Sequence, residues 1–135
     1  MRLVLILAGA GAALLLGGAA NAPILAFRSI EPGEWQLRAL DGSQPPARLC
    51  INDAYDLIQL RHPGAACSRF VLANEPEMAT VHYTCTGAGY GRTTVKVETS
   101  MLVRIESQGL ANRSPFQMTL EGRRIGPCGT SHVPR

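Results

Sequence analysis

Cysteine is the residue type in this chain best suited to form covalent or metal bonds. The four cysteines are Cys50, Cys67, Cys85 and Cys128. Zinc sites and redox-active sites usually hold two cysteines separated by two residues, and the sequence contains no such pair. An even number of widely spaced cysteines is typical of disulfides in an oxidising compartment. The sequence therefore predicts two disulfide bonds, without a metal site or redox catalysis.

Three histidines, His62, His82 and His132, are the other candidate metal ligands. His82 and Cys85 are three residues apart in an expected strand, so their side chains point to opposite faces. His62 lies near the end of an expected helix, and His132 lies in the C-terminal tail. We therefore expect all three histidines to be surface groups rather than ligands.

Acidic residues provide no convincing catalytic pair. Glu75 and Glu77 flank Pro76 in an expected turn, where carboxylates are usually solvated. Asp53 and Asp56 are explained by the start of a helix. Motifs of the G-x-S-x-G and H-E-x-x-H types are absent from the sequence. We therefore expect no catalytic residues.

The glycines at positions 87, 89 and 91 could suggest a phosphate-binding loop. Such loops lead into a helix whose N-terminus attracts the anion, and no helix is expected here. A hairpin turn is the better interpretation, so no cofactor is predicted. The sequence Asn112-Arg113-Ser114 matches a glycosylation site but is interpreted as a loop.

The N-terminal segment resembles an export signal. Arg2 precedes an uncharged, small and apolar run that extends to Ala20. We predict a signal peptide over residues 1–20, because cleavage after Ala22 would place Pro23 directly after the cut. An uncleaved membrane anchor is the alternative. The expected location is the periplasm, with no stable membrane insertion after cleavage.

The remaining chain is long enough for one domain. We expect a linker over residues 21–30, a disulfide-bonded β domain over residues 31–128 and a flexible tail over residues 129–135. The formal net charge is +3 at pH 7, and basic and acidic residues are interspersed. This distribution does not indicate nucleic-acid binding.

Apolar residues alternate with polar ones along most of the chain, which is typical of antiparallel strands with one solvated face. The predicted inward rows are Trp35, Leu37 and Ala39; Val81, Tyr83 and Cys85; Thr93, Val95 and Val97; Met101, Val103 and Ile105; and Phe116, Met118 and Leu120. Trp35 is expected to pack in the core. The fold class is mainly β: an antiparallel meander or small barrel-like sheet of about seven strands.

One segment, residues 52–62, lacks this alternation. Asn52 or Asp53 can cap a helix, and Ala54, Leu57 and Ile58 fall on one helical face. The pair Pro63-Gly64 would end the helix. One short α-helix is predicted here, either packed on the sheet or closing one end of it.

Strand direction constrains the disulfides. If successive strands alternate in direction, Cys67 and Cys85 meet at one end of the sheet, and Cys50 and Cys128 meet at the other. Cys67–Cys85 with Cys50–Cys128 is therefore favoured. Cys50–Cys67 with Cys85–Cys128 remains an alternative, which requires the last strand to end at the opposite side.

Several of these features together resemble a known family. They are Pro32, Gly33 and Trp35 at the start of the first strand, the four spaced cysteines, and the ending Gly122-Arg123-Arg124-Ile125-Gly126-Pro127-Cys128. This combination is similar to the domain of unknown function 3617 family, over roughly residues 30–128. The resemblance implies a small exported protein of a Gram-negative bacterium. It implies no activity and no catalytic residue.

Two kinds of function remain. The first is an envelope interaction protein without enzymatic activity, with Leu102 and Leu110 as the first candidates for an apolar contact surface. The alternative is a lipocalin-like binder of a small apolar ligand, in a pocket lined by Val95, Val97, Val103, Ile105, Phe116 and Met118. An interior above roughly 300 Å³ would favour the ligand hypothesis. We expect a filled interior.

Overall fold

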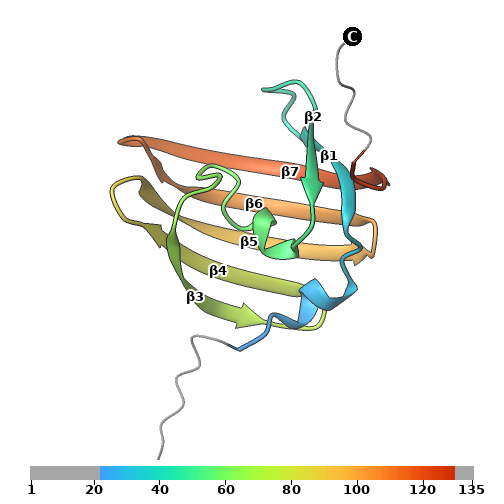
Figure 1. Ribbon diagram of the computed structural model, residues 1–135. Coiled ribbons are helices and arrows are strands. Elements are labelled where there is room, and N and C mark those ends of the chain that lie inside the picture. Colours follow the sequence, from blue (N-terminus) through green and yellow to red (C-terminus); the bar gives the residue numbers. More distant parts are fainter. Residues whose placement is uncertain (1–21, 130–135) are drawn as a thin grey trace, which may run out of the picture.

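The computed structural model describes residues 22–129 (Figure 1). One antiparallel sheet contains the seven strands of this region. Their bounds are β1 Gly33–Ala39, β2 Ala47–Ile51, β3 Cys67–Asn74, β4 Met78–Cys85, β5 Gly89–Thr99, β6 Leu102–Ala111 and β7 Ser114–Gly126. Two 3-10 helices accompany them, η2 at Leu25–Ser29 and η3 at Ala54–Leu57. The predicted mainly β fold is confirmed.

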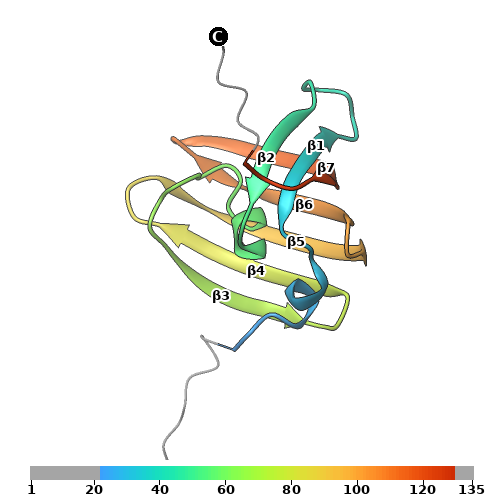
Figure 2. The ribbon, with the colours of Figure 1, turned by 45° about the vertical axis from the view of Figure 1, so that its right-hand side comes forward.

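The strand order is β2-β1-β7-β6-β5-β4-β3. Strands β3 to β7 form a meander, and β1 then pairs with β7, far away in sequence. The sheet is open, so β2 and β3 are its two edges and the barrel alternative does not apply. Figures 1 and 2 show β1 and β2 running at a steep angle to the other strands, with η3 in front of the sheet.

Side-chain alternation places the core on one face of this sheet. Val95, Ile105 and Leu120 are register partners across β5, β6 and β7 and share that face. Val95 and Ile105 are almost completely buried. Trp35 is also fully buried, and its indole Nε1 donates a hydrogen bond to the carbonyl of Glu31. Its prediction as a core residue is confirmed.

The segment before β1 differs from the linker that we expected over residues 21–30. Ile24, Ala26, Phe27 and Ile30 are buried and belong to the main hydrophobic cluster. The backbone N–H of Glu31 donates to the carbonyl of Ser100, which ties the end of this segment to the β5–β6 turn. The apolar residues of this stretch do not alternate as in a strand, and the stretch is too short for a long helix, so the sequence pattern did not predict their burial.

The predicted α-helix over residues 52–62 is wrong. Only residues 54–57 are helical, in a 3-10 turn whose cap is Asp53: its carboxylate accepts from the N–H of Tyr55. Leu57, Ile58 and Gln59 are all buried although they are consecutive. An amphipathic helix would direct one of these three side chains outward, so an irregular turn fills the core better here.

Both predicted disulfides are confirmed. Cys67 and Cys85 are register partners on β3 and β4, and Cys50 on β2 is bonded to Cys128 beyond β7. Disulfides of this kind persist in oxidising compartments, so the two bonds indicate an extracytoplasmic location.

The predicted signal peptide and the tail beyond Gly129 lie outside the described residues. Within residues 22–129, no helix has the length and apolar character needed to cross a membrane.

Candidate functional site

A cleft of about 760 Å³ lies on the core face of the sheet, beside the filled core. We call it the apolar cleft. Its sheet wall comes from β1, β2 and the first half of β7, and its opposite wall comes from residues 56–64. The apolar residues that line it are Leu37, Ala39, Pro45, Ala47, Leu49, Leu60, Pro63, Pro115, Phe116, Met118 and Leu120.

The predicted ligand-lining residues separate into two groups. Val95, Val97, Val103 and Ile105 are buried at 7% exposure or less, pack against other core side chains and do not line the apolar cleft. Phe116 and Met118 do line the apolar cleft, where both are only partly buried. The expectation of a filled interior therefore holds beneath β5 and β6, whereas an open volume lies next to them.

Few charged groups border the apolar cleft. Arg48, Asp56 and Arg61 are its ionisable lining residues. The guanidinium carbon of Arg61 lies 5.5 Å from the centre of the Phe116 ring, so this cation packs on an aromatic face at the border. Arg48 lies 3.9 Å from the carboxylate of Glu34, an exposed and weak ion pair. Apolar surface therefore dominates the cleft.

His62 is buried, which corrects our expectation of a surface histidine; its exposed fraction is 5%. Nε2 lies 3.1 Å from the carbonyl oxygen of Ala88 and 3.2 Å from that of Leu110. Carbonyls only accept, so Nε2 carries a proton. Nδ1 lies 2.9 Å from the Tyr83 hydroxyl, which donates to it when the imidazole is neutral. The ring thus connects the 52–66 segment to β4, to the β4–β5 turn and to β6.

The glycine-rich stretch makes room for this pair. A Cβ atom on Gly91 would lie 2.5 Å from the Tyr83 hydroxyl oxygen, and one on Gly89 would lie 1.9 Å from the Leu110 carbonyl oxygen. Gly89 also has a φ of +125°, which strains any other residue. Gly87 lies in the turn that we predicted, whereas Gly89 and Gly91 belong to β5. Their function is therefore structural packing.

Burial raises the pKa of the Tyr83 hydroxyl, because the phenolate is poorly solvated in the core. The nearby positive charge of Arg61 acts in the opposite direction and is the smaller effect. Tyr83 therefore stays protonated at neutral pH and remains available to donate to His62.

A second polar contact inside the core joins the sheet to the same segment. The Thr93 hydroxyl lies 2.6 Å from the carbonyl oxygen of Ile58 and 2.7 Å from the Ser107 hydroxyl. Thr93 and Ser107 are almost completely buried. The sequence predicted that Thr93 faces inward. Its hydrogen bond to the Ile58 carbonyl could not be predicted, because the alternation of polar and apolar residues says nothing about the irregular segment.

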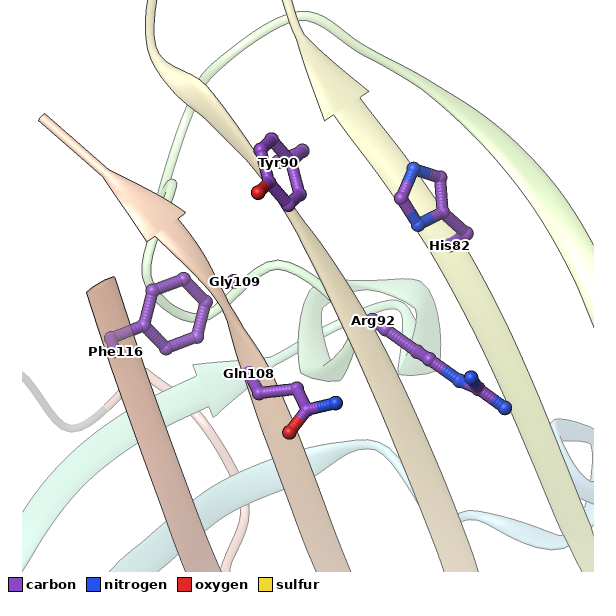
Figure 3. Close-up of a pocket in the computed structure, with 6 residues that line it drawn as sticks. All are labelled: His82, Tyr90, Arg92, Gln108, Gly109 and Phe116. Carbon is purple, nitrogen blue, oxygen red and sulfur yellow. The ribbon is translucent and has the colours of Figure 1, made fainter. Parts of the chain in front are cut away.

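A smaller depression of about 340 Å³ lies on the outer side of the sheet. Figure 3 shows the side chains around it, and we call it the outer hollow: His82, Tyr90, Arg92, Gln108, Gly109 and Phe116. His82, Arg92 and Gln108 are register partners on β4, β5 and β6. The His82 and Tyr90 rings lie 6.1 Å apart at an interplanar angle of 30°. Phe116 borders both depressions. His82 is partly exposed and faces the outer hollow.

The other predicted surface residues do not gather into a site. Leu102 and Leu110 are only partly exposed, so they form no apolar patch. The larger exposed apolar side chains are Leu25, Leu40, Leu49, Phe70, Leu72, Tyr90, Met101 and Ile125. Glu75 and Glu77 lie at the β3–β4 turn. Within residues 22–129, no group of three or more His, Cys, Asp or Glu side chains is placed to hold a metal ion.

Comparison with known proteins gives no match: no family model, no curated protein and no solved structure is similar to this chain at a significant level.

Proposed function

We propose that this protein is a non-enzymatic binding protein, exported to the periplasm of a Gram-negative bacterium, that holds a small apolar ligand in the apolar cleft. The two disulfides support a location outside the cytoplasm. The apolar N-terminal run of the sequence and the family resemblance support the periplasm. The lining of the cleft supports binding, since its few ionisable groups are not arranged as an acid–base pair.

The volume and lining of the apolar cleft carry this proposal. At about 760 Å³ it lies well within the roughly 300–1,000 Å³ of small-molecule sites. Leu49 is 37% exposed there, and Met118 and Leu120 are partly exposed beside it. A ligand that buries about ten methylene groups would gain roughly 8 kcal/mol before the cost of association.

The proposal is tested with a neutral fluorescent probe, N-phenyl-1-naphthylamine, and with two variants of the cleft wall. Ala47→Trp fills the cleft, and Leu49→Asp places a charge in it. Both positions lie on the edge strand β2 and are exposed, so the core should be preserved. Met101→Asp is the matched control, because Met101 is 48% exposed and does not line the cleft.

We expect the wild type and Met101→Asp to bind the probe equally, and both cleft variants to bind it at least tenfold more weakly. Native mass spectrometry of protein from the periplasm should then show an added mass that denaturation removes and that Ala47→Trp reduces. Equal probe binding by all four proteins, or no binding by any of them, would refute the proposal.

A second candidate is binding of another envelope polypeptide, favoured by the exposed side chains of Phe70 and Leu72. They are 57% and 47% exposed and lie on the edge strand β3. Exposed apolar residues on a strand without an outer neighbour can pack against a partner strand. This candidate predicts that one defined polypeptide crosslinks to the wild type in intact cells and is lost in Phe70→Ser and Leu72→Ser, but kept in Leu25→Ser.

A further inference from the structure

We infer that the outer hollow is a second binding site, which recognises an acidic saccharide, that is, a pyranose ring carrying a carboxylate. This inference is independent of the proposed function, because the polar groups of the hollow lie on the outer face of the sheet. Three observations carry it: an uncompensated positive charge, aromatic rings beside it, and neutral groups that both donate and accept hydrogen bonds.

The positive charge is the guanidinium of Arg92. Within residues 22–129, the ion pairs involve Arg38, Arg48 and Arg123, and not Arg92. Its register partners on either side, His82 and Gln108, are not acidic. The nearest row of the outer face with an acidic side chain is that of Thr94 and Glu106, and no ion pair joins Glu106 to Arg92. Arg92 is therefore free to bind a carboxylate through two parallel N–H donors.

The rings beside Arg92 suit the apolar face of a sugar. Tyr90 is 46% exposed, and its ring and that of His82 are inclined by only 30°. In Figure 3 these two rings lie at one end of the group of side chains, and the Gln108 amide and the Arg92 guanidinium lie at the other. The C–H groups of a pyranose pack on aromatic faces, whereas a bare inorganic anion gains nothing from them.

The remaining polar groups suit sugar hydroxyls. The Gln108 amide, the His82 imidazole and the Tyr90 hydroxyl can each donate and accept, as a sugar hydroxyl does. Gly109 borders the hollow through its backbone, because a Cβ atom there would collide with the backbone of Tyr90 on β5. Its volume of about 340 Å³ is at the lower end of small-molecule sites, so it fits one or two sugar rings and not a long apolar chain.

The inference is tested with trigalacturonate as the acidic probe and its trimethyl ester as the matched neutral probe, both titrated into the full domain by NMR. Arg92→Gln removes the charge, and Tyr90→Leu removes the aromatic face. Arg104→Gln is the control, because Arg104 is exposed on β6 but does not line the hollow. All three positions are exposed or strand-surface sites, and a retained amide spectrum verifies that each variant folds.

We expect trigalacturonate to shift backbone signals of β4, β5 and β6, and Arg92→Gln to weaken its binding at least tenfold. Arg104→Gln should leave the affinity within twofold of the wild type. The ester should bind the wild type as weakly as trigalacturonate binds Arg92→Gln, and Tyr90→Leu should weaken both probes.

Several results would overturn the inference. They are no signal shifts with either probe, equal affinity for acid and ester, or a loss in Arg104→Gln as large as that in Arg92→Gln. Competition by sulfate at a concentration equal to that of trigalacturonate would also overturn it, because the hollow would then be a general anion site. Each of these results leaves the naphthylamine experiment on the apolar cleft unaffected.

Discussion

The Nδ1 atom of His62 lies 2.9 Å from the hydroxyl oxygen of Tyr83, in the buried interior between the 52–66 segment and the sheet. The other ring nitrogen contacts two backbone carbonyls, so all polar atoms of this imidazole are satisfied. Because Arg61 and Pro63 on either side of His62 line the apolar cleft, this contact also fixes one wall of the candidate site.

Replacing Tyr83 with phenylalanine should therefore destabilise the protein. The substitution removes only the hydroxyl and leaves Nδ1 of His62 buried without a partner. We expect the free energy of unfolding to fall by about 1–3 kcal/mol. Urea denaturation measures the effect, with Tyr90→Phe as the control, since the exposed Tyr90 hydroxyl is free to bond with water. A loss of equal size in both variants would contradict the proposed importance of the His62 contact.

The raised pKa of Tyr83 predicts a loss of stability in alkali. Burial raises the folded-state pKa above the usual value of about 10. As the pH rises, the unfolded chain therefore releases this proton before the folded protein does. The stability that the protonated Tyr83 contributes to the folded protein is complete below about pH 10 and is lost as the pH rises through the folded-state pKa. Urea unfolding between pH 8 and pH 11 should show a decline that is smaller in Tyr83→Phe. Ultraviolet titration should show a tyrosine that ionises above the usual pKa of about 10 in the wild type, and this signal should be absent from Tyr83→Phe.

Thr93→Val tests the second contact between the sheet and the irregular segment. The variant keeps the size of the side chain but leaves the Ile58 carbonyl and the Ser107 hydroxyl without their bonds to Thr93. We expect a loss of about 1–3 kcal/mol and faster amide hydrogen exchange at residues 58–62. Thr84→Val on the exposed face of β4 is the control and should change neither quantity. Unchanged exchange at residues 58–62 in Thr93→Val would show that this bond does not hold the segment.

The two disulfides should differ in their contribution to stability. They enclose sequence separations of 78 residues for Cys50–Cys128 and 18 for Cys67–Cys85. In the chain-entropy model the longer loop contributes about 4–5 kcal/mol and the shorter about 3 kcal/mol. Paired serine substitutions should therefore lower the melting temperature more at Cys50 and Cys128. The reverse order would show that native packing, rather than loop length, determines the difference.

Strand alternation allowed most of the sheet to be predicted. The inward rows around Trp35, Val81 and Val95 follow directly from a period of two, and the pairing of the cysteines follows from strand direction. Phe116 and Met118, which line the apolar cleft, could be placed on the inward face of their strand for the same reason. The alternation did not predict the conformation of residues 52–66, because an irregular turn has no repeating spacing of apolar residues.

The candidate sites were therefore only partly predictable. The burial of His62 depends on that turn. The signal for it in the sequence was the pair Gly89 and Gly91, which we interpreted as part of a hairpin turn but which lie on one face of β5. Such glycines often mark the close approach of a large side chain, which here is Tyr83. Arg92 and Gln108 could be recognised as neighbours only once the register of β5 and β6 was known.

The pairing of β1 with β7 has a consequence for how the chain matures. Leu37 pairs with Gly122, so the first hairpin to be synthesised has no sheet to join until the last strand exists. Until then the thiol of Cys50 has only Cys67 and Cys85 as available partners, and both belong to another bond. Native oxidation therefore requires that Cys50 stays reduced until Cys128 emerges, or that an early wrong bond is exchanged within seconds to hours. The yield of natively folded protein should accordingly depend on thiol exchange during biogenesis.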